Sequence, residues 1–351
     1  MGAARARTKA VKPLRVLVLM HKDLVPPPDP AAAPEKERER WQCELDILGA
    51  LKKLGHEARA LGVQSDLGVI REAIEEWKPD IAFNLLEEFD GVAVYDQHVV
   101  SFLELMRKPY TGCNPRGMTL ARDKALTKQI LAWHRIRVPG FMVFPVGRKV
   151  VPSRRLPYPL IVKSVSEEAS LGIAQASIVH DDAKLKERVE FVHAQLRTDA
   201  IAEQYIEGRE LYVALLGNRR VTSFPVWEMF FASLPSATEP IATARMKWDK
   251  KYQQKIGLTT AAAKDLPPAL ELAILRTCRR TWRALGLSGY ARLDLRLTAD
   301  GQVHVIEANP NPNLEAAEDF AASAKAAGLA YPKLIQRILK LGLDWHPEWP
   351  A

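Results

Sequence analysis

The sequence predicts two kinds of fold in one chain, an α/β unit near the N-terminus and an α+β region after it. Three observations predict this. Strand-like and helix-like segments alternate from residue 15 to about residue 120, which is typical of a small parallel sheet covered by helices. Further strand-like segments recur between residues 158 and 226. Polar and apolar residues alternate strictly over residues 291–297, which is the period of a half-buried strand.

The first 120 residues supply the elements of the α/β unit. Residues 15–20 form a short apolar run of the kind found in buried strands, and residues 80–86 form a second. A helix is expected over residues 35–54 because Gly55 then provides a helix stop. The other expectations are helices at 70–77 and 99–106 and a flexible basic tail at 1–14.

Two further domains are expected at residues 121–205 and 206–351. The first should hold helices at 120–134 and 181–196 and strands at 158–163, 173–179 and 201–206. The second should hold strands at 211–216 and 221–226, a long polar stretch at 244–266, a helix at 268–285, a hairpin at 289–313, and two helices between 316 and 341. Gly328 and Pro332 separate those last two helices, since glycine favours helix ends and proline helix starts.

The hairpin carries charged and amide side chains on one face. Asp300-Gly301 is a favoured two-residue turn, and with this turn as the loop Asp294 lies opposite Glu307 and Arg292 opposite Asn309. Facing residues of a strand pair have Cβ atoms about 5 Å apart, and like charges at that distance repel. One interpretation is a cation between the carboxylates, and Mg²⁺ suits such oxygen ligands. The alternative is a solvated hairpin whose carboxylates pair with its own arginines.

Composition excludes several classes of protein. Hydrophobic residues make up 47% and charged residues 26%, as in ordinary globular proteins. No apolar run approaches the roughly 18 residues of a membrane span, and the first residues lack the apolar core of a signal peptide. The three cysteines lack metal-ligand spacing, which favours reduced thiols in a cytoplasm. The basic N-terminal tail supplies much of the net charge of +8, so a nucleic-acid partner is not favoured.

Two connecting segments have the chemistry of a nucleotide site. Lys163 ends an apolar strand before a loop of small residues that includes Ser170, and a lysine with loop amides there can contact phosphates. The alternative is an ordinary solvated lysine. Residues 203–210, with the sequence EQYIEGRE, join two strands. Such a connector can follow the edge of an adenine and end in a carboxylate that binds ribose hydroxyls, or it can be a plain polar loop.

Together with the hairpin, these segments resemble the ATP-grasp superfamily and, within it, the D-alanine–D-alanine ligase-like group, over about residues 110–341. The resemblance implies an N-terminal Rossmann-like domain followed by two domains that grip ATP between antiparallel sheets. It implies an ATP-dependent ligase that joins a carboxylate to an amine through an acylphosphate and releases ADP. Amino acids or short peptides are the implied substrates, and ATP with two Mg²⁺ ions, or Mn²⁺, the implied cofactors. It is also compatible with a homodimer.

The resemblance assigns roles residue by residue. The implied ATP-binding residues are Lys124, Lys163, Glu203, Gln204, Ile206 and Glu210. The implied metal ligands are Asp294, Glu307 and Asn309. The implied catalytic residues are Arg292, Lys251, Tyr252 and Ser170, with Lys251 and Tyr252 on a loop that closes over the γ-phosphate.

Departures from the family pattern concentrate where the substrates should bind. The loop at 84–91 reads NLLEEFDG and places Glu87 where D-alanine ligases have a histidine, and Asn313 replaces a glycine whose amide holds the oxyanion. We therefore expect a carboxylate–amine pair other than two D-alanines. Glu87, Glu88 and Asp90 are candidates to recognise an amino group or another cationic part of the substrate. The alternative for this loop is a solvated acidic segment.

Two other functions stay open at this point. One is a true D-alanine–D-alanine ligase. The other, from a different class, is an ATP-binding switch or interaction module without ligase activity. Retention of both hairpin carboxylates together with Arg292 and Asn309 argues against the switch, because binding alone needs fewer of these groups.

Overall fold

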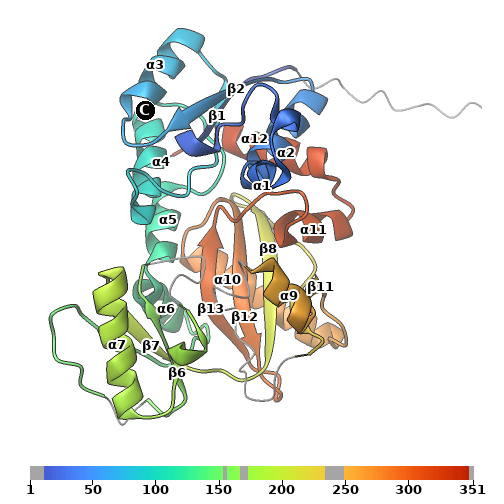
Figure 1. Cartoon of the computed structure of the whole chain (residues 1–351). Coiled ribbons are helices and arrows are strands. Elements are labelled where there is room, and N and C mark those ends of the chain that lie inside the picture. The colour runs from blue at the N-terminus through green and yellow to red at the C-terminus, as the bar shows by residue number, and fades with distance from the viewer. Residues whose placement is uncertain (1–11, 153–155, 167–172, 234–248, 348–351) are drawn as a thin grey trace, which may run out of the picture.

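The computed structural model describes residues 12–152, 156–166, 173–233 and 249–347. Within these residues the strands form three sheets, one parallel and two antiparallel (Figure 1). The predicted combination of α/β and α+β architecture is therefore confirmed.

The N-terminal sheet has the strand order β2-β1-β3, and both pairings are parallel. Its central strand is buried over five consecutive apolar residues, as expected of a parallel strand covered on both faces. Because the carboxyl ends of parallel strands meet at one edge, the loops after β1 and β3 lie together. The elements are β1 (Arg15–His21), η1 (Lys22–Leu24), η2 (Pro30–Ala32), α1 (Glu35–Arg40), α2 (Gln42–Lys53), β2 (Glu57–Val63), α3 (Gly68–Trp77), β3 (Ile81–Asn84), η3 (Ala93–Tyr95) and α4 (Asp96–Leu105).

Two expectations for this region need correction. The helix predicted over residues 35–54 is broken at Trp41, whose backbone leaves the helical region and whose indole N–H donates to the Asp23 carbonyl at 3.4 Å. Strand β2 was not predicted. It pairs only with β1 and is mostly half-exposed, so its sequence lacks the apolar run that marks a buried strand.

The middle sheet has the order β4-β7-β5-β6 and is antiparallel throughout. The predicted helix at 120–134 is divided at Asp123, whose carboxylate accepts hydrogen bonds from two backbone N–H groups of α6 and so caps it. The predicted strand at 173–179 is reduced to its last two residues. The elements are α5 (Pro115–Arg122), α6 (Lys124–Trp133), β4 (Phe141–Phe144), β5 (Leu160–Ser164), η4 (Gln175–Ser177), β6 (Ile178–Val179), α7 (Asp182–Leu196) and β7 (Ala200–Gln204).

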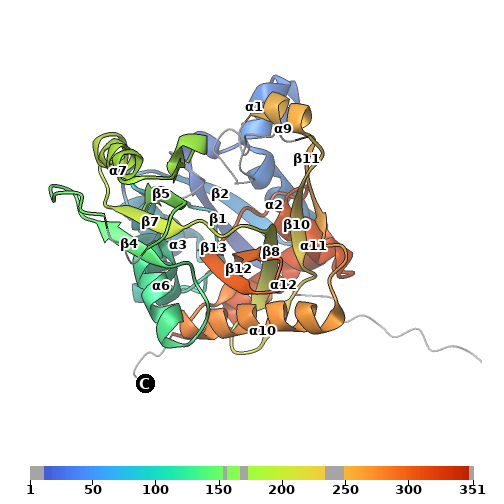
Figure 2. The same cartoon turned by 90° about the horizontal axis from the view of Figure 1, so that it is seen from below.

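The largest sheet follows the order β11-β10-β8-β12-β13, with β9 paired to β8. Helix α10 covers its back, where Ile274, Cys278 and Trp282 join the same core as Leu293 and Val305 (Figure 2). Strands β10 and β11 were not predicted. The elements are β8 (Arg209–Gly217), β9 (Val221–Ser223), β10 (Trp227–Phe231), α9 (Lys250–Ile256), β11 (Leu258–Ala262), α10 (Pro268–Ala284), β12 (Gly289–Leu297), β13 (Val303–Pro310), α11 (Asp319–Ala326) and α12 (Tyr331–Leu343).

The predicted pairing of the hairpin is confirmed at the functional residues, but the structure produces it through a different turn. Asp294 lies opposite Glu307 and Arg292 opposite Asn309, as predicted. The two-residue turn is wrong, because the Thr298 N–H donates to the Gln302 carbonyl at 3.0 Å and leaves a three-residue loop that ends in Gly301 at φ +81°. A β-bulge compensates: Asp294 pairs with residue 307 and Leu295 with residue 305, so Ile306 is an extra residue.

The C-terminal helices return to the N-terminal sheet. Ile335 and Leu339 of α12 belong to the same buried cluster as Ile47 and Leu51 of α2 and Phe83 of β3. The core beneath the parallel sheet therefore draws on both ends of the chain, and the domain boundaries at residues 120 and 205 stay a prediction. In the part of the chain that the structure describes, none of the helices has the length and apolar character needed to span a membrane.

Candidate active site

A small cavity of about 90 Å³ lies between the middle sheet and the largest sheet. Its described walls combine aliphatic side chains with charged ones. The aliphatic residues are Ile161, Ile173, Ile206, Leu295 and Ile306, and the charged residues are Lys163, Glu203, Glu210, Asp294, Arg296 and Glu307. Gln204, Tyr205 and Tyr212 also line it. Aliphatic walls suit the faces of a flat ring, and a buried lysine suits phosphate oxygens.

Lys163 and Glu203 form an ion pair in this small cavity. The Lys163 Nζ lies 3.1 Å from Oε2 of Glu203, and both side chains are buried. Burial by itself would lower the pKa of Lys163, but Glu203 and Glu307 outweigh it and the net direction is upward. Burial would raise the pKa of Glu203, and the neighbouring lysines turn the net direction downward. Both groups are therefore charged.

Glu210 is held by Tyr212, which the sequence did not single out, and by Arg296, which was considered only as a partner of the hairpin carboxylates. Its carboxylate accepts hydrogen bonds from the Tyr212 hydroxyl at 2.7 Å and from Arg296 at 2.6 Å. Arg296 also donates to the Gly208 carbonyl at 3.1 Å. Arg296 follows the alternation of β12 and so points to the same face as Asp294 and Arg292, which is the signal that would have found it.

On the hairpin, Arg292 and Asp294 pair with each other. Arg292 donates to both carboxylate oxygens of Asp294, at 2.8 and 3.0 Å, and stacks over the Tyr212 ring at 5.0 Å. Burial would lower the pKa of Arg292, but Asp294 outweighs this and the net direction is upward. Asp294 thus has a hairpin arginine as partner, as the alternative interpretation expected.

The hairpin also fits a magnesium ion. Asp294, Glu307 and Asn309 bring two carboxylates and an amide oxygen to adjacent strands. No group of three or more His, Cys, Asp or Glu side chains that could hold a metal occurs in the described part of the chain. Such a site suits Mg²⁺, which takes one or two carboxylates plus phosphate oxygens and water.

A large cavity of about 480 Å³ adjoins the small cavity and shares Tyr212 and Glu307 with it. It is lined by residues of the N-terminal region, of the strands β8, β10 and β11, of α9, of the hairpin and of the start of α11. The charged and amide lining residues are Glu87, Asp96, Arg122, Gln253, Arg292, Glu307, Asn309, Asn311, Asn313, Glu318 and Asp319. The predicted substrate residues Glu87 and Asn313 therefore share one cavity with two of the three predicted metal ligands, Glu307 and Asn309.

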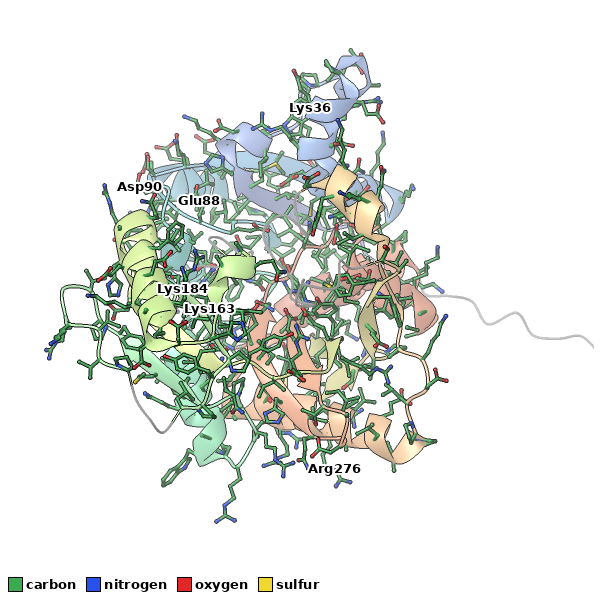
Figure 3. All side chains as sticks on the ribbon, turned by 60° about the horizontal axis from the view of Figure 1, so that its bottom comes forward. Lys36, Glu88, Asp90, Lys163, Lys184 and Arg276 are labelled. Atoms are coloured by element: carbon green, nitrogen blue, oxygen red, sulfur yellow. The ribbon has the colours of Figure 1, made fainter. Side chains whose placement is uncertain are left out.

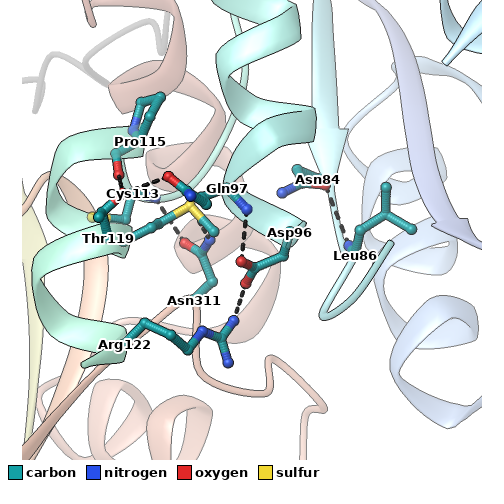
Figure 4. A network of polar contacts seen from close by, with 10 residues as sticks. Asn84, Leu86, Asp96, Gln97, Cys113, Pro115, Thr119, Arg122 and Asn311 are labelled. Carbon is teal, nitrogen blue, oxygen red and sulfur yellow. Dashed lines mark hydrogen bonds and ion pairs between the residues drawn. The ribbon is translucent and has the colours of Figure 1, made fainter. Parts of the chain in front are cut away.

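An ion pair between Asp96 and Arg122 forms part of the wall of the large cavity (Figure 4). Asp96 lies in the first turn of α4 and accepts a second hydrogen bond from the Gln97 N–H at 2.6 Å. Nearby, Asn311 accepts from the Cys113 N–H at 2.7 Å and ties β13 to the N-terminal region. This ion pair joins residues far apart in sequence, so no local pattern indicated it.

Several predicted site residues lie elsewhere. Glu88 pairs with His21 at 3.1 Å and, like Asp90, belongs to the N-terminal loops, whereas Lys163 lies deeper (Figure 3). Neither Glu88 nor Asp90 is among the described residues lining the large cavity. Lys251 and Tyr252 lie on α9. Of the residues of α9, their neighbour Gln253 is the one found among the described residues that line that cavity. Lys124 is buried at the start of α6, and its N–H donates to the Val165 carbonyl at 3.2 Å. Ser170 is outside the described residues.

Two antiparallel sheets enclose a small cavity with aliphatic and charged walls, beside a hairpin with two facing carboxylates, and this arrangement is that of an ATP-grasp enzyme. Comparison with known proteins agrees. The family model described as "D-ala D-ala ligase C-terminus" matches residues 145–340. The chain belongs to the D-alanine–D-alanine ligase family, and it is an ATP-dependent, ADP-forming ligase of carbon–nitrogen bonds.

Relatives extend the match beyond the C-terminal region. An uncharacterized protein of Sinorhizobium fredii, y4sG, is 31% identical over 300 residues, which cover 84% of this chain and 85% of that protein. A D-alanine–D-alanine ligase of Bordetella petrii is 32% identical over 240 residues, which cover 68% and 69%. The fold resembles that of the D-alanine–D-alanine ligase from Bacillus anthracis complexed with ATP, with a TM-score of 0.74, 22% identity, and coverage of 94% and 98%.

Proposed function

We propose that this ligase activates an amino acid or short peptide other than D-alanine at its carboxylate and joins it to an amine. The observation that carries the proposal is the large cavity, which adjoins the proposed nucleotide site and contains Glu87 and Asn313, two departures from the D-alanine ligase pattern. Glu87 would bind a cationic group of a substrate. The carboxylate substrate would lie near Arg292, since that arginine lines the cavity beside the predicted metal ligands.

In the proposed reaction, the substrate carboxylate attacks the γ-phosphate of ATP to give an acylphosphate and ADP. The amine then attacks the acyl carbon, loses a proton and expels phosphate. Arg292 would stabilise the anionic intermediates, and Lys163 would hold the phosphates. Asp294, Glu307 and Asn309 would hold Mg²⁺, as two ions or as Mn²⁺, and the bound metal would neutralise charge on the β- and γ-phosphates. Gln204 and Ile206 would contact the adenine.

D-alanine as substrate is the second candidate, because relatives such as the Bordetella petrii protein are named D-alanine–D-alanine ligases. In that case the chain would form the dipeptide despite its different residues at positions 87 and 313. The homodimer that the family resemblance implies stays a prediction.

The test is a substrate screen with purified protein and Mg-ATP. Amino acids and dipeptides are supplied singly and in pairs, phosphate release is followed, and the product is identified by mass spectrometry. We expect an amide product from a pair other than D-alanine with itself. Formation of the D-alanine dipeptide as the preferred product would refute the altered specificity. ATP binding without any product would favour a nucleotide-dependent switch.

A further inference from the structure

Three buried charges form a cluster at the small cavity. Lys128 of α6 places its Nζ 3.0 Å from Oε1 of Glu203, while Lys163 reaches the other carboxylate oxygen at 3.1 Å. The exposed fractions of Lys128, Glu203 and Lys163 are 0%, 1% and 6%. Glu203 and Lys163 line the small cavity, whereas Lys128 is not among the described residues that do so. Lys128 therefore lies behind the two groups that face the nucleotide.

Lys128 also contacts the hairpin. Its ammonium donates to the carbonyl oxygen of Ile306 at 2.7 Å, and Ile306 is the extra residue of the β-bulge beside Glu307. One side chain of α6 thus contacts the middle sheet through Glu203 and the metal-binding strand through Ile306. Buried lysines are rare without such partners, because an unpaired ammonium is costly to remove from water.

The charge of this cluster depends on Lys128. The two lysines and Glu203 by themselves carry a net charge of +1, and Lys163 is the lysine of the pair that lines the small cavity. The Glu307 carboxylate, a predicted metal ligand, also acts on both lysines. Without Lys128, Glu203 and Lys163 would form a neutral pair, and much of the attraction of Lys163 for phosphates would be lost. Charges at 3 Å in a buried site interact strongly, so this difference bears directly on nucleotide affinity.

We propose that Lys128 is a positioning residue for ATP: it neutralises Glu203 and so keeps the charge of Lys163 available to the phosphates. This inference rests on the proposed role of Lys163 as a phosphate ligand. Through Ile306, Lys128 also fixes the strand that carries Glu307 against the same cluster. It acts only through other residues and does not touch the nucleotide.

The protonation of the cluster agrees with this arrangement. Burial lowers the pKa of Lys128 to about 8, with Glu203 opposing the shift. Lys128 is therefore mostly charged at neutral pH. The pKa of Glu203 is shifted downward by the two lysines against the effect of burial, so its carboxylate is ionised.

The test measures Mg-ATP binding by calorimetry, without amino-acid substrates, for the whole chain and its variants. Lys128→Met should weaken binding about 10-fold, which is about 1.4 kcal/mol of binding free energy. We expect Lys128→Arg, which keeps the charge, to bind more tightly than Lys128→Met. Lys184→Met is the matched control, since Lys184 is exposed on α7 and pairs with Glu187 of the same helix, and its binding should match that of the unchanged chain.

The double variant Lys128→Met/Glu203→Gln separates charge from packing. It restores the net charge of +1 on Lys163, so it should bind Mg-ATP more tightly than Lys128→Met if the charge is what matters. Glu203→Gln alone is measured beside it, because Glu203 is itself an implied ATP-binding residue. A purely structural role predicts that the second change adds damage. Binding by Lys128→Met equal to that of the unchanged chain, or a double variant no better than Lys128→Met, overturns the proposal.

Circular dichroism and thermal melting check that each variant folds. If Lys128→Met does not fold, the double variant is compared with Glu203→Gln alone: affinities within about 3-fold of each other support the proposal, and a double variant more than about 3-fold weaker overturns it. The assay distinguishes the two levels of inference. No Mg-ATP binding by the unchanged chain would defeat the proposed function, whereas normal binding that is indifferent to Lys128 would defeat only this inference.

Discussion

The small cavity and the large cavity share Tyr212 and Glu307 but are assembled in different ways. The small cavity is built from two antiparallel sheets, and its charged groups are held in pairs such as Lys163 with Glu203 and Glu210 with Arg296. The large cavity combines strand residues of β8, β10, β11, β12 and β13 with loop residues from the N-terminal region, the hairpin end and the approach to α11. A rigid site preserves one chemistry, whereas loops around it can change substrate without disturbing the sheets.

The largest effect is expected from removing the charge of Arg292, at the boundary of the two cavities. Arg292→Met should lower kcat about 100- to 1000-fold, as loss of a group that stabilises a transition-state oxyanion does. Arg292 lines the large cavity and pairs with Asp294. Steady-state phosphate release measures the effect. Arg276→Met is the control, because Arg276 is exposed on α10, away from both cavities (Figure 3). Retention of full kcat by Arg292→Met would contradict the assigned role.

A second prediction concerns the contact between the hairpin and the N-terminal region. Gly289 has φ +69°, and a Cβ there would lie 2.1 Å from the Gly112 carbonyl oxygen. Gly301 has φ +81°, but a Cβ there would meet nothing within 4 Å, so it shares the backbone strain without the collision. Gly289→Ala should therefore lower the free energy of unfolding by about 1–3 kcal/mol more than Gly301→Ala. Urea denaturation compares them, and equal losses would refute the close contact.

The third prediction separates the two cavities functionally. Glu87→Gln should raise the KM of the substrate that carries the cationic group about 10-fold, as loss of a charged hydrogen bond does, and leave the KM of ATP unchanged. Glu88→Gln is the matched control, since Glu88 pairs with His21 and is not among the described lining residues. Equal effects of the two substitutions would show that the position of Glu87 in the large cavity is irrelevant.

The fourth prediction is a pH dependence of stability that comes from Glu44 of α2. Burial, with contributions from Glu87 and Glu315, raises the pKa of Glu44 from 4.5 to about 7. Between these values the folded chain keeps a proton that the unfolded chain releases, so stability falls as pH rises from 4.5 to 7. The stability of the unchanged chain relative to Glu44→Gln should drop by about 1–3 kcal/mol across this range. A difference independent of pH would refute the raised pKa.

Sequence reasoning was most successful where structure is local. The alternation of β12 and β13 was enough to place Asp294 opposite Glu307, although the turn had three residues and a bulge corrected the register. The connector at 203–210 reaches the small cavity for the same reason, since it directly joins two strands.

Local sequence patterns could not predict ion pairs between residues that are distant in the sequence. Lys128 with Glu203, and Asp96 with Arg122, each join segments that only the tertiary fold brings together. Glu203 was predicted to read adenine, but its carboxylate lies between two lysines. Lys251 was predicted from a resemblance, and α9 does not bring it into the described lining of the large cavity. The roles assigned to both residues stay predictions.

The single additional residue at Ile306 has a consequence for how this hairpin tolerates insertions and deletions. Because Leu295 pairs with Val305 and Asp294 with Glu307, removing Ile306 would join the two halves of the ladder without a gap and keep the carboxylates face to face. The deletion would remove the Ile306 carbonyl, which accepts a hydrogen bond from the Lys128 ammonium. It would also remove one aliphatic side chain from the wall of the small cavity. Chains of this family that lack the extra residue should therefore need another acceptor for a lysine at that place in α6.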